Sequence, residues 1–271
     1  MTHPQIWISL VLSFKVVSQP SRPPVFQHKI TTNMNAKMRV DIWSDIMCPF
    51  CYIGKRNFEK ALAEFPAKDS VEVVWHSFQL NPDLTYQPNK SFYDYVAELK
   101  GQTREWSIQV HKTLVQTAKY AGLDYRLDQA KVTNSLDAHR LIQLAKKYNL
   151  TNDLEERFFR AYFTEGALLS DHQTLLTLST ETGLQPDVVK QVLQSDLYKD
   201  KVRQDAQRVR QMGATGVPFF VFNQTQAVSG AQQPKVFAQA LAAAYEQWVQ
   251  TKNEKIDIVG GAVCTPEGYC N

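Results

Sequence analysis

The sequence predicts an α/β domain interrupted by an all-helical insertion. Strand patterns occur at residues 39–44 and 71–78, and they return only at 219–222 and 226–229. The residues between them, 91–212, show helical periodicity. Because strands at both ends share one sheet only if the chain closes across the intervening helices, the helical block is predicted to be a subdomain inserted into the α/β domain.

The first strand and helix adjoin a pair of cysteines. Residues 39–44 are β-branched and alternate in polarity, as expected for a strand. They lead into Cys48-Pro49-Phe50-Cys51, after which apolar residues recur at helical spacing as far as Pro66. The second strand, 71–78, ends before Asn81-Pro82-Asp83, whose residues favour a turn.

The helical block divides into segments that end at glycines. Helical spacing is seen over 92–99, 103–120, 134–148, 152–163, 171–182 and 186–212, the last broken once or twice. Glycines stand where helices are expected to end, at Gly101, Gly122, Gly166 and Gly183. Beyond the block, 219–222 and 226–229 are predicted strands, and 234–251 is a predicted amphipathic helix that begins with a proline.

Composition limits the class of protein. The chain has 271 residues, of which 44% are hydrophobic and 21% charged, so a sizeable core is expected and disorder only at the ends. The charges alternate along helices and sum to only +3, which argues against nucleic-acid binding. Four cysteines in two close pairs are typical of a reduced compartment, so we expect a cytoplasmic protein that does not bind membranes.

The first 37 residues differ from the rest. Residues 6–17 are mostly apolar but too short to span a bilayer, and three prolines follow by residue 24. Because Met34 and Met38 stand just before the first strand, we expect a disordered extension or an artefact of start-codon choice. A poor secretory signal or a membrane tether is the alternative.

The expected organisation has five parts. They are a disordered extension over 1–37, the first part of the α/β domain over 38–90, the helical insertion over 91–212, the second part of the α/β domain over 213–252, and a flexible tail with a cysteine pair over 253–271.

The Cys48-x-x-Cys51 motif indicates thiol–disulfide chemistry. Its place between a strand and a helix puts Cys48 at the N-cap and Pro49 at the first helical position, where a missing N–H costs nothing. Unpaired backbone N–H groups and the positive end of the helix dipole favour the thiolate of Cys48. Cys51, one turn later, is expected to be more buried. We therefore predict that Cys48 forms a mixed disulfide and that Cys51 resolves it.

The residue between Pro49 and Cys51 bears on the redox potential. Phe50 neither donates a hydrogen bond nor carries a positive charge, so it does not stabilise a thiolate. We therefore expect the couple to be less oxidising than the strongest periplasmic oxidants.

A proline begins the third predicted strand, in Gly216-Val217-Pro218-Phe219. Proline is tolerated there only where its absent N–H does not interrupt a ladder. An ordinary trans proline is the simpler interpretation, but the presence of Cys-x-x-Cys in the same chain favours cis. A cis bond would leave the Val217 N–H and C=O free to pair with a substrate segment.

At these residues the chain resembles the DsbA-like thioredoxin family, and within it the FrnE-like branch. That branch is related to 2-hydroxychromene-2-carboxylate isomerases and kappa-class glutathione transferases. The resemblance spans roughly residues 39–250 and rests on five ordered motifs: Asp45-Ile-Met-Cys-Pro-Phe-Cys51, Phe78-Gln-Leu-Asn-Pro-Asp83, Asn134-Ser-Leu-Asp-Ala-His-Arg140, Gly216-Val-Pro-Phe-Phe220 and Val228-Ser-Gly-Ala-Gln232.

The resemblance implies a thioredoxin-like fold with an inserted helical subdomain and disulfide oxidoreductase or isomerase activity. It also implies that Cys48 is the nucleophile, Cys51 the resolving thiol and Pro218 a cis-proline. The glutathione-dependent relatives are the alternative, because they share the fold and the Asn…His-Arg segment. Their motif generally lacks the second cysteine, so the presence of Cys51 favours dithiol exchange and leaves glutathione open as a reductant.

Four polar residues have two interpretations each. Asp45 is either a proton acceptor near the cysteines or a cap of the turn. His76, alone on a strand, is a structural residue more often than a functional one. His139 and Arg140 lie on a predicted helix that the resemblance suggests packs over the active site, so they either bind substrate or hold the contact between subdomains, or they are ordinary packing residues.

The tail cysteines, Cys264 and Cys270, have three interpretations. They form an accessory redox pair that exchanges with Cys48 and Cys51, as similar pairs in FrnE-like proteins suggest, or close a structural loop, or bind a metal. Two cysteines supply only half of a four-ligand zinc site, so we expect no metal.

No nucleotide or phosphate motif is present, so no cofactor is expected. Electrons are expected to come from a redox partner protein, glutathione or a substrate thiol, and the partners to be thiol or disulfide substrates. The chain is expected to be a monomer or homodimer. A chaperone or binding module without enzymatic activity is a further hypothesis.

Overall fold

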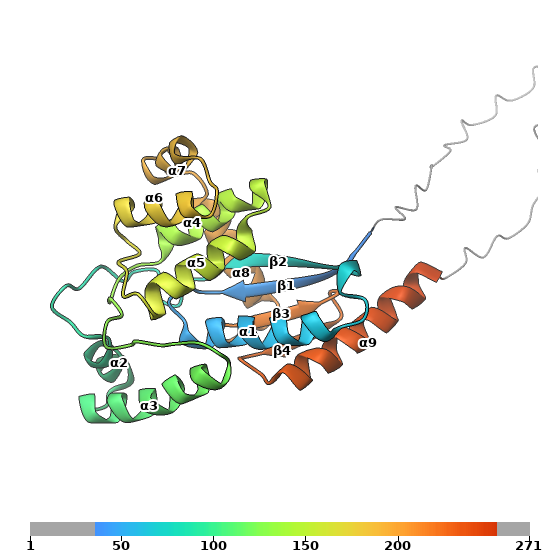
Figure 1. Ribbon diagram of the computed structural model, residues 1–271, viewed down its shortest axis with the longest axis horizontal. Helices are drawn as coiled ribbons and strands as arrows, with labels where there is room; N and C mark the ends of the chain where they lie inside the picture. The colour runs from blue at the N-terminus through green and yellow to red at the C-terminus, as the bar shows by residue number, and fades with distance from the viewer. Residues whose placement is uncertain (1–35, 254–271) are drawn as a thin grey trace, which may run out of the picture. The chain divides into compact units, whose positions relative to one another are not determined.

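The computed structural model describes residues 36–253 (Figure 1). The N-terminal segment 1–35 and the segment 254–271, which carries Cys264 and Cys270, lie outside the described residues. Within the described part, no helix is long and apolar enough to cross a membrane.

One four-stranded mixed sheet forms the centre of the α/β domain. Its strands are β1 (Met38–Ser44), β2 (Val71–Ser77), β3 (Phe219–Phe222) and β4 (Gln226–Ser229), in the order β2-β1-β3-β4. β1 runs parallel to β2 and antiparallel to β3, so strands from both ends of the chain pair directly. The thioredoxin-like fold with an inserted helical subdomain is thereby confirmed.

Helices cover both faces of this sheet. Helices α1 (Pro49–Glu64) and α9 (Pro234–Asn253) pack on one face, and α8 (Lys199–Gln211) packs on the other (Figure 1). Residues that alternate along β1 face opposite ways. Ile42 joins the apolar cluster beneath α1 and α9, while Trp43 joins the cluster beneath α8.

The insertion consists of short helices. They are α2 (Phe92–Lys100), α3 (Arg104–Tyr120), α4 (Leu136–Ala145), α5 (Thr151–Phe163), α6 (His172–Glu181) and α7 (Pro186–Leu193), with a 3₁₀ turn at Lys146–Tyr148 after α4. A second 3₁₀ turn, Lys68–Ser70, lies outside the insertion, between α1 and β2. The predicted helix over 186–212 breaks once, between α7 and α8. Gly101 ends α2 at a φ of 61°, a left-handed conformation that glycine adopts without the steric cost of a Cβ.

Aromatic residues join the insertion to α1. Tyr52 stacks on Phe159 of α5 with ring centroids 4.8 Å apart and an angle of 4° between the planes. Tyr125, in the loop after α3, stacks on Phe163 at 4.7 Å. Both cysteines belong to this same apolar cluster, so the insertion's core continues to the start of α1.

Candidate active site

Cys48 and Cys51 begin helix α1, as the motif predicts. Cys48 is the N-cap, Pro49 is the first helical residue, and both cysteines are buried free thiols, 4% and 1% exposed. The Cys48 N–H donates to the Asp45 carbonyl and the Cys51 N–H to the Cys48 carbonyl, each at 2.9 Å. Backbone hydrogen bonds therefore close the turn that carries the two cysteines.

The Cys48 sulfur does not cap the helix, which differs from the expectation that amide N–H groups stabilise it directly. Pro49 has no N–H, and the Cys51 N–H is already used by the Cys48 carbonyl. The thiol instead donates to the Val217 carbonyl oxygen at 3.6 Å. Cys48, the predicted nucleophile near the start of the described chain, thus lies against the Val217–Pro218 loop near its end.

The Cys51 thiol is held in its protonated form. Burial raises the pKa of this thiol well above its usual value, and the neighbouring Cys48 raises it further. The nearby Asp45 backbone and Ser44 side chain lower the pKa of this thiol without cancelling the effect of burial. Cys51 must therefore lose a proton before it acts as a nucleophile.

The Val217–Pro218 peptide bond is cis, the geometry expected from the sequence. The Pro218 carbonyl accepts from the Gly230 N–H at 2.8 Å, which ties the loop to the residue after β4. On its other side, the proline ring packs against Gly54 of α1. The loop is thus held between α1 and the β3–β4 hairpin.

Asp45 caps the turn and also reaches the insertion. Its carboxylate accepts from the Met47 N–H at 3.1 Å and from the Leu80 N–H at 2.7 Å. One oxygen also lies 3.3 Å from Nε2 of His139, which is fully buried on α4. The structure therefore brings Asp45 and His139 together beside the cysteine turn.

An apolar cavity of about 480 Å³ opens beside Cys48. Its wall includes Cys48, Phe50 and Val217 on the sheet side and residues of α2 on the insertion side, among them Phe92 and Val96. Three apolar side chains on this wall are largely exposed: Phe50 at 49%, Leu80 at 53% and Leu99 at 60%. The Cys48 sulfur thus borders a space suited to an apolar segment or molecule.

A family model described as a DSBA-like thioredoxin domain matches residues 39–242. The chain belongs to this family. Membership assigns it to the broad class of thiol–disulfide oxidoreductases and related enzymes.

Two individual proteins are similar to this DsbA-like chain over most of its length. The solved structure of a probable DsbA oxidoreductase, SCO1869 from Streptomyces coelicolor, is 38% identical and has a TM-score of 0.74, covering 86% of this chain and 98% of that one. The uncharacterized protein YwbO of Bacillus subtilis (strain 168) is 28% identical over 212 residues, which cover 76% of this chain and 96% of YwbO.

Two more distant structures share the fold. They are a 2-hydroxychromene-2-carboxylate isomerase, 14% identical with a TM-score of 0.56, and the cytosolic disulfide reductase DsbM from Pseudomonas aeruginosa with GSH, 17% identical with a TM-score of 0.55. Each of the two matches covers 79% of this chain and 99% of the other protein's chain.

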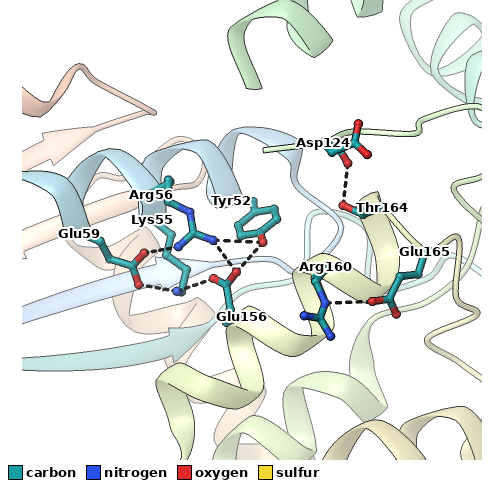
Figure 2. A network of polar contacts seen from close by, with 9 residues as sticks. All are labelled: Tyr52, Lys55, Arg56, Glu59, Asp124, Glu156, Arg160, Thr164 and Glu165. Atoms are coloured by element: carbon teal, nitrogen blue, oxygen red, sulfur yellow. Dashed lines mark hydrogen bonds and ion pairs between the residues drawn. The ribbon is translucent and has the colours of Figure 1, made fainter. Parts of the chain in front are cut away.

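A charged network joins α1 of the α/β domain to α5 of the insertion (Figure 2). Glu156 accepts from the Tyr52 hydroxyl at 2.6 Å, from Lys55 at 2.8 Å and from Arg56 at 2.5 Å. Lys55 and Arg56 also pair with Glu59 on their own helix. Sequence patterns did not reveal this network, because its partners are far apart in the chain.

Tyr125 is a second neighbour of the site that sequence reasoning missed. Its buried hydroxyl donates to the Pro49 carbonyl at 2.6 Å. Burial, then the nearby charges of Cys48, Tyr52 and Cys51, raise the pKa of this phenol well above its usual value. Tyr125 therefore supports the cysteine turn from the insertion side, and the apolar residues beside it in this loop, Leu123 and Leu127, were the one sequence signal of its burial.

Arg140 points away from the cysteines, although it is adjacent to His139. Its guanidinium donates to the carbonyls of Leu197 at 2.8 Å, Val192 and Ser195, and to Asp137 at 2.6 Å. The three carbonyl contacts tie α4 to the end of α7 and to the segment that follows it. The structure thus places Arg140 in the packing of the insertion.

His76 is also outside the cysteine site. Its Nε2 lies 2.5 Å from Asp41 and its Nδ1 lies 3.1 Å from Asp205, so the ring links β1 and β2 to α8. Trp43 stacks on the ring at 4.4 Å and donates to the Asp205 carbonyl at 2.9 Å. These contacts agree with the structural interpretation of His76.

Within residues 36–253, no three His, Cys, Asp or Glu side chains are grouped to hold a metal ion.

Proposed function

We propose that this DsbA-like protein is a dithiol–disulfide oxidoreductase or isomerase that exchanges disulfides of other proteins through Cys48 and Cys51. The main support is one arrangement: the Cys48 thiol lies at the edge of an apolar cavity, 3.6 Å from the Val217 carbonyl, with a second free thiol one turn behind it. A nucleophile and its resolving thiol are thereby adjacent to a binding surface.

The exchange proceeds in two steps. The Cys48 thiolate attacks a substrate disulfide, forms a mixed disulfide and releases one substrate thiolate. Cys51 then loses its proton and attacks the Cys48 sulfur, so the Cys48–Cys51 disulfide forms and the second substrate thiolate leaves. Two electrons pass from the protein to the substrate. The reverse sequence oxidises a substrate dithiol.

The cavity wall supports an extended apolar segment as the substrate. Phe50, Leu80 and Leu99 expose apolar surface around Cys48, and clustered surface of this kind commonly marks a binding site. The Val217 backbone on the same wall offers hydrogen bonds to a strand-like segment. Partly unfolded polypeptides meet both requirements.

Insulin reduction with dithiothreitol tests this function. The wild-type chain should accelerate precipitation of the insulin B chain, Cys48→Ser should abolish the acceleration, and Cys51→Ser should accumulate a mixed disulfide with insulin. If Cys48→Ser retains the wild-type effect, the chain is not acting as an oxidoreductase, and a chaperone or binding module becomes the better account.

A glutathione-dependent isomerase or transferase is the second candidate. The cavity of about 480 Å³ is within the size range of small-molecule sites. This function requires turnover of a small molecule with glutathione that survives Cys51→Ser. Loss of all activity in that variant would exclude it.

The electron donor and the tail pair belong to the same proposal. We propose a cytoplasmic protein whose disulfide is reduced by glutathione, a redox protein or a substrate thiol, with Cys264 and Cys270 as an accessory pair. Replacing both tail cysteines with serine should slow reduction of the Cys48–Cys51 disulfide. If the rate of reduction is unchanged, Cys264 and Cys270 are not an accessory redox pair, and a structural role for them becomes the better account.

A further inference from the structure

The insertion side of the cavity beside Cys48 carries a buried histidine. His111 of α3 is 7% exposed and lines this cavity of about 480 Å³ together with Phe92 and Val96 of α2. Phe92 and Tyr93 pack edge-on against its ring, with ring centroids 5.1 Å and 5.7 Å away. These aromatic neighbours hold the imidazole in one orientation at the cavity wall.

The tautomer of His111 follows from its contact on α3. Its Nδ1 lies 2.6 Å from the Ser107 carbonyl oxygen, which can only accept, so Nδ1 carries the proton of the neutral ring. Nε2 then has a free lone pair, and no hydrogen bond joins it to another residue of the described chain. Burial lowers the pKa of His111, and the bond to Ser107 offsets only part of this shift. The ring is therefore neutral at physiological pH, and its Nε2 is an acceptor.

A serine hydroxyl on the same wall also makes no hydrogen bond to the described residues. Ser135 is 3% exposed and precedes α4, but its side chain does not cap the helix. Asn134 takes that role, because its side-chain oxygen accepts from the Leu136 N–H at 2.7 Å. Since buried polar groups in folded proteins nearly always have partners, a ligand in the cavity meets two groups, on His111 and Ser135, that are available to it.

The rest of the wall selects against a charged ligand. The space between Cys48 and His111 is mostly apolar, so a lysine or arginine side chain would lose its hydration there. The Asp45 carboxylate on this wall offers it little compensation, because two backbone N–H groups and His139 already occupy its oxygens. The ammonium of Lys100, which also lines the cavity, would repel a second cation.

The depth of the cavity selects the length of the ligand. Cys48 begins α1 of the α/β domain and His111 belongs to α3 of the insertion, so the cavity separates the sulfur from the imidazole. Serine and threonine are too short to carry a hydroxyl across it, and phenylalanine brings no donor. Tyrosine is apolar along its ring and ends in an O–H group that must find a partner when buried.

We propose that the cavity binds a tyrosine side chain of the polypeptide substrate, with its phenol hydroxyl donating to Nε2 of His111. This inference rests on the proposed function and names the substrate feature that the site selects. The ring fills the apolar part of the cavity while the substrate cysteine reacts with Cys48 and the neighbouring backbone lies along Val217. His111 is a specificity residue, and it takes no part in the exchange of electrons.

Equilibria with model peptides measure this preference. The full chain with Cys51→Ser, Cys264→Ser and Cys270→Ser keeps Cys48 as its one thiol. This parent chain is equilibrated in a glutathione buffer with short peptides that hold one cysteine and one variable residue, placed one, two or three positions away on either side. The variable residue is tyrosine, O-methyltyrosine or phenylalanine. Mass spectrometry gives the fraction of the chain in mixed disulfide with the peptide.

At the best position, the tyrosine peptide should form the mixed disulfide about fivefold more favourably than the O-methyltyrosine and phenylalanine peptides, which lack the donor. His111→Phe keeps a ring but no acceptor, and should bring the ratio of tyrosine to phenylalanine to about one. His111→Gln, whose amide oxygen accepts, should keep a ratio above about two. His172→Phe is the matched control and should behave as the parent chain, because His172 is exposed and pairs with Asp137.

Equal mixed-disulfide fractions for the three residues at every position would overturn the proposal. That comparison uses the parent chain alone, so misfolding of a His111 variant does not affect it. A tyrosine preference that survives in His111→Phe would also overturn the proposal, since the hydroxyl would then bind elsewhere. If no peptide forms a mixed disulfide with Cys48, the proposed function fails, and this inference fails with it.

Discussion

Gly54 on α1 packs directly against Pro218. A β-carbon at residue 54 would lie 2.9 Å from the proline Cγ and 3.4 Å from the ring of Phe220. Because real β-carbons essentially never approach a heavy atom that closely, the helix that carries the cysteines and the loop that faces them fit together only with glycine at this position.

Gly54→Ala should push the Pro218 loop away from Cys48. Overpacking costs about 1–3 kcal/mol, and alanine's better helix propensity returns up to about 1 kcal/mol, so we expect a small net loss in the free energy of unfolding. Displacement at the reacting sulfur should have a larger effect, a fall of about tenfold or more in insulin reduction. The two quantities are measured by urea unfolding and by the insulin assay.

Gly216→Ala is the matched control for this substitution. Gly216 lies in the same loop, but no atom stands within 4 Å of the place that a β-carbon would occupy there. The alanine variant should therefore keep wild-type activity. Equal losses in both variants would show that the loop tolerates no change at all, and the Gly54–Pro218 contact would have no special role.

Asp205 is expected to make stability depend on pH in the acid range. Burial raises the pKa of its carboxyl, but the hydrogen bond from His76 and the charge of Lys146 outweigh burial and bring the pKa to about 2. A carboxyl whose pKa is lower in the folded than in the unfolded chain stabilises the fold above its unfolded pKa. That contribution, about 2 kcal/mol, is lost as the pH falls from about 4 to about 2.

Asp205→Asn should therefore unfold more easily than wild type at neutral pH, and the difference should shrink by more than half between about pH 5 and about pH 2. Urea unfolding at several pH values measures it. Asp200→Asn on the same helix is the control, since Asp200 is exposed and its ion pair is with exposed Arg203. A difference that stays constant with pH would rule out a role for the Asp205 charge.

Phe50→His should make the Cys48–Cys51 disulfide more oxidising. Phe50 is half exposed beside Cys48 and offers no hydrogen bond, whereas an imidazole can donate to a thiolate or carry positive charge. Stabilising the reduced form should shift the equilibrium with glutathione towards the dithiol by about tenfold. Phe50→Leu, which keeps an apolar side chain, should leave the equilibrium constant unchanged. Equal constants for the histidine and wild-type chains would contradict the expectation.

The local elements could be predicted because they depend on local sequence. The β-branched alternation of 39–44 and the apolar run of 219–222 predicted β1 and β3 within one residue, and Gly101 marked the end of α2 through its need for a positive φ. Cys48, Cys51 and Pro218 were predicted together because each occupies a recognisable position at the end of a strand or the start of a helix.

The supporting contacts could not be predicted, because they depend on how distant segments pack. Nothing near Tyr125 in sequence indicates that its hydroxyl reaches Pro49, and nothing near Glu156 indicates Tyr52. The sequence also failed to predict that the Cys48 thiol donates to the Val217 carbonyl instead of lying against the helix amides. This contact depends on the Val217–Pro218 loop, which is distant in sequence, packing beside the start of α1.

Arg140 should prove essential for stability and dispensable for chemistry. Its buried guanidinium is the donor for three backbone carbonyls at the end of α7 and in the segment that follows, and lysine's single ammonium does not reproduce that planar fork. Arg140→Lys should leave at least one buried carbonyl unpaired and lower the free energy of unfolding by about 2–3 kcal/mol. Insulin reduction per folded molecule should stay within about twofold of wild type, because the contacts of Arg140 lead away from the cysteine loop.

Arg160→Lys supplies the comparison, since the same substitution there affects one exposed ion pair with Glu165 and should cost less than about 1 kcal/mol. Urea unfolding and the insulin assay on both variants separate the two roles that the sequence left open for Arg140. A stable Arg140→Lys protein with strongly reduced activity would place Arg140 in substrate binding. An unstable protein with normal activity per folded molecule would place it in the packing that holds α4, and with it His139, against the cysteine loop.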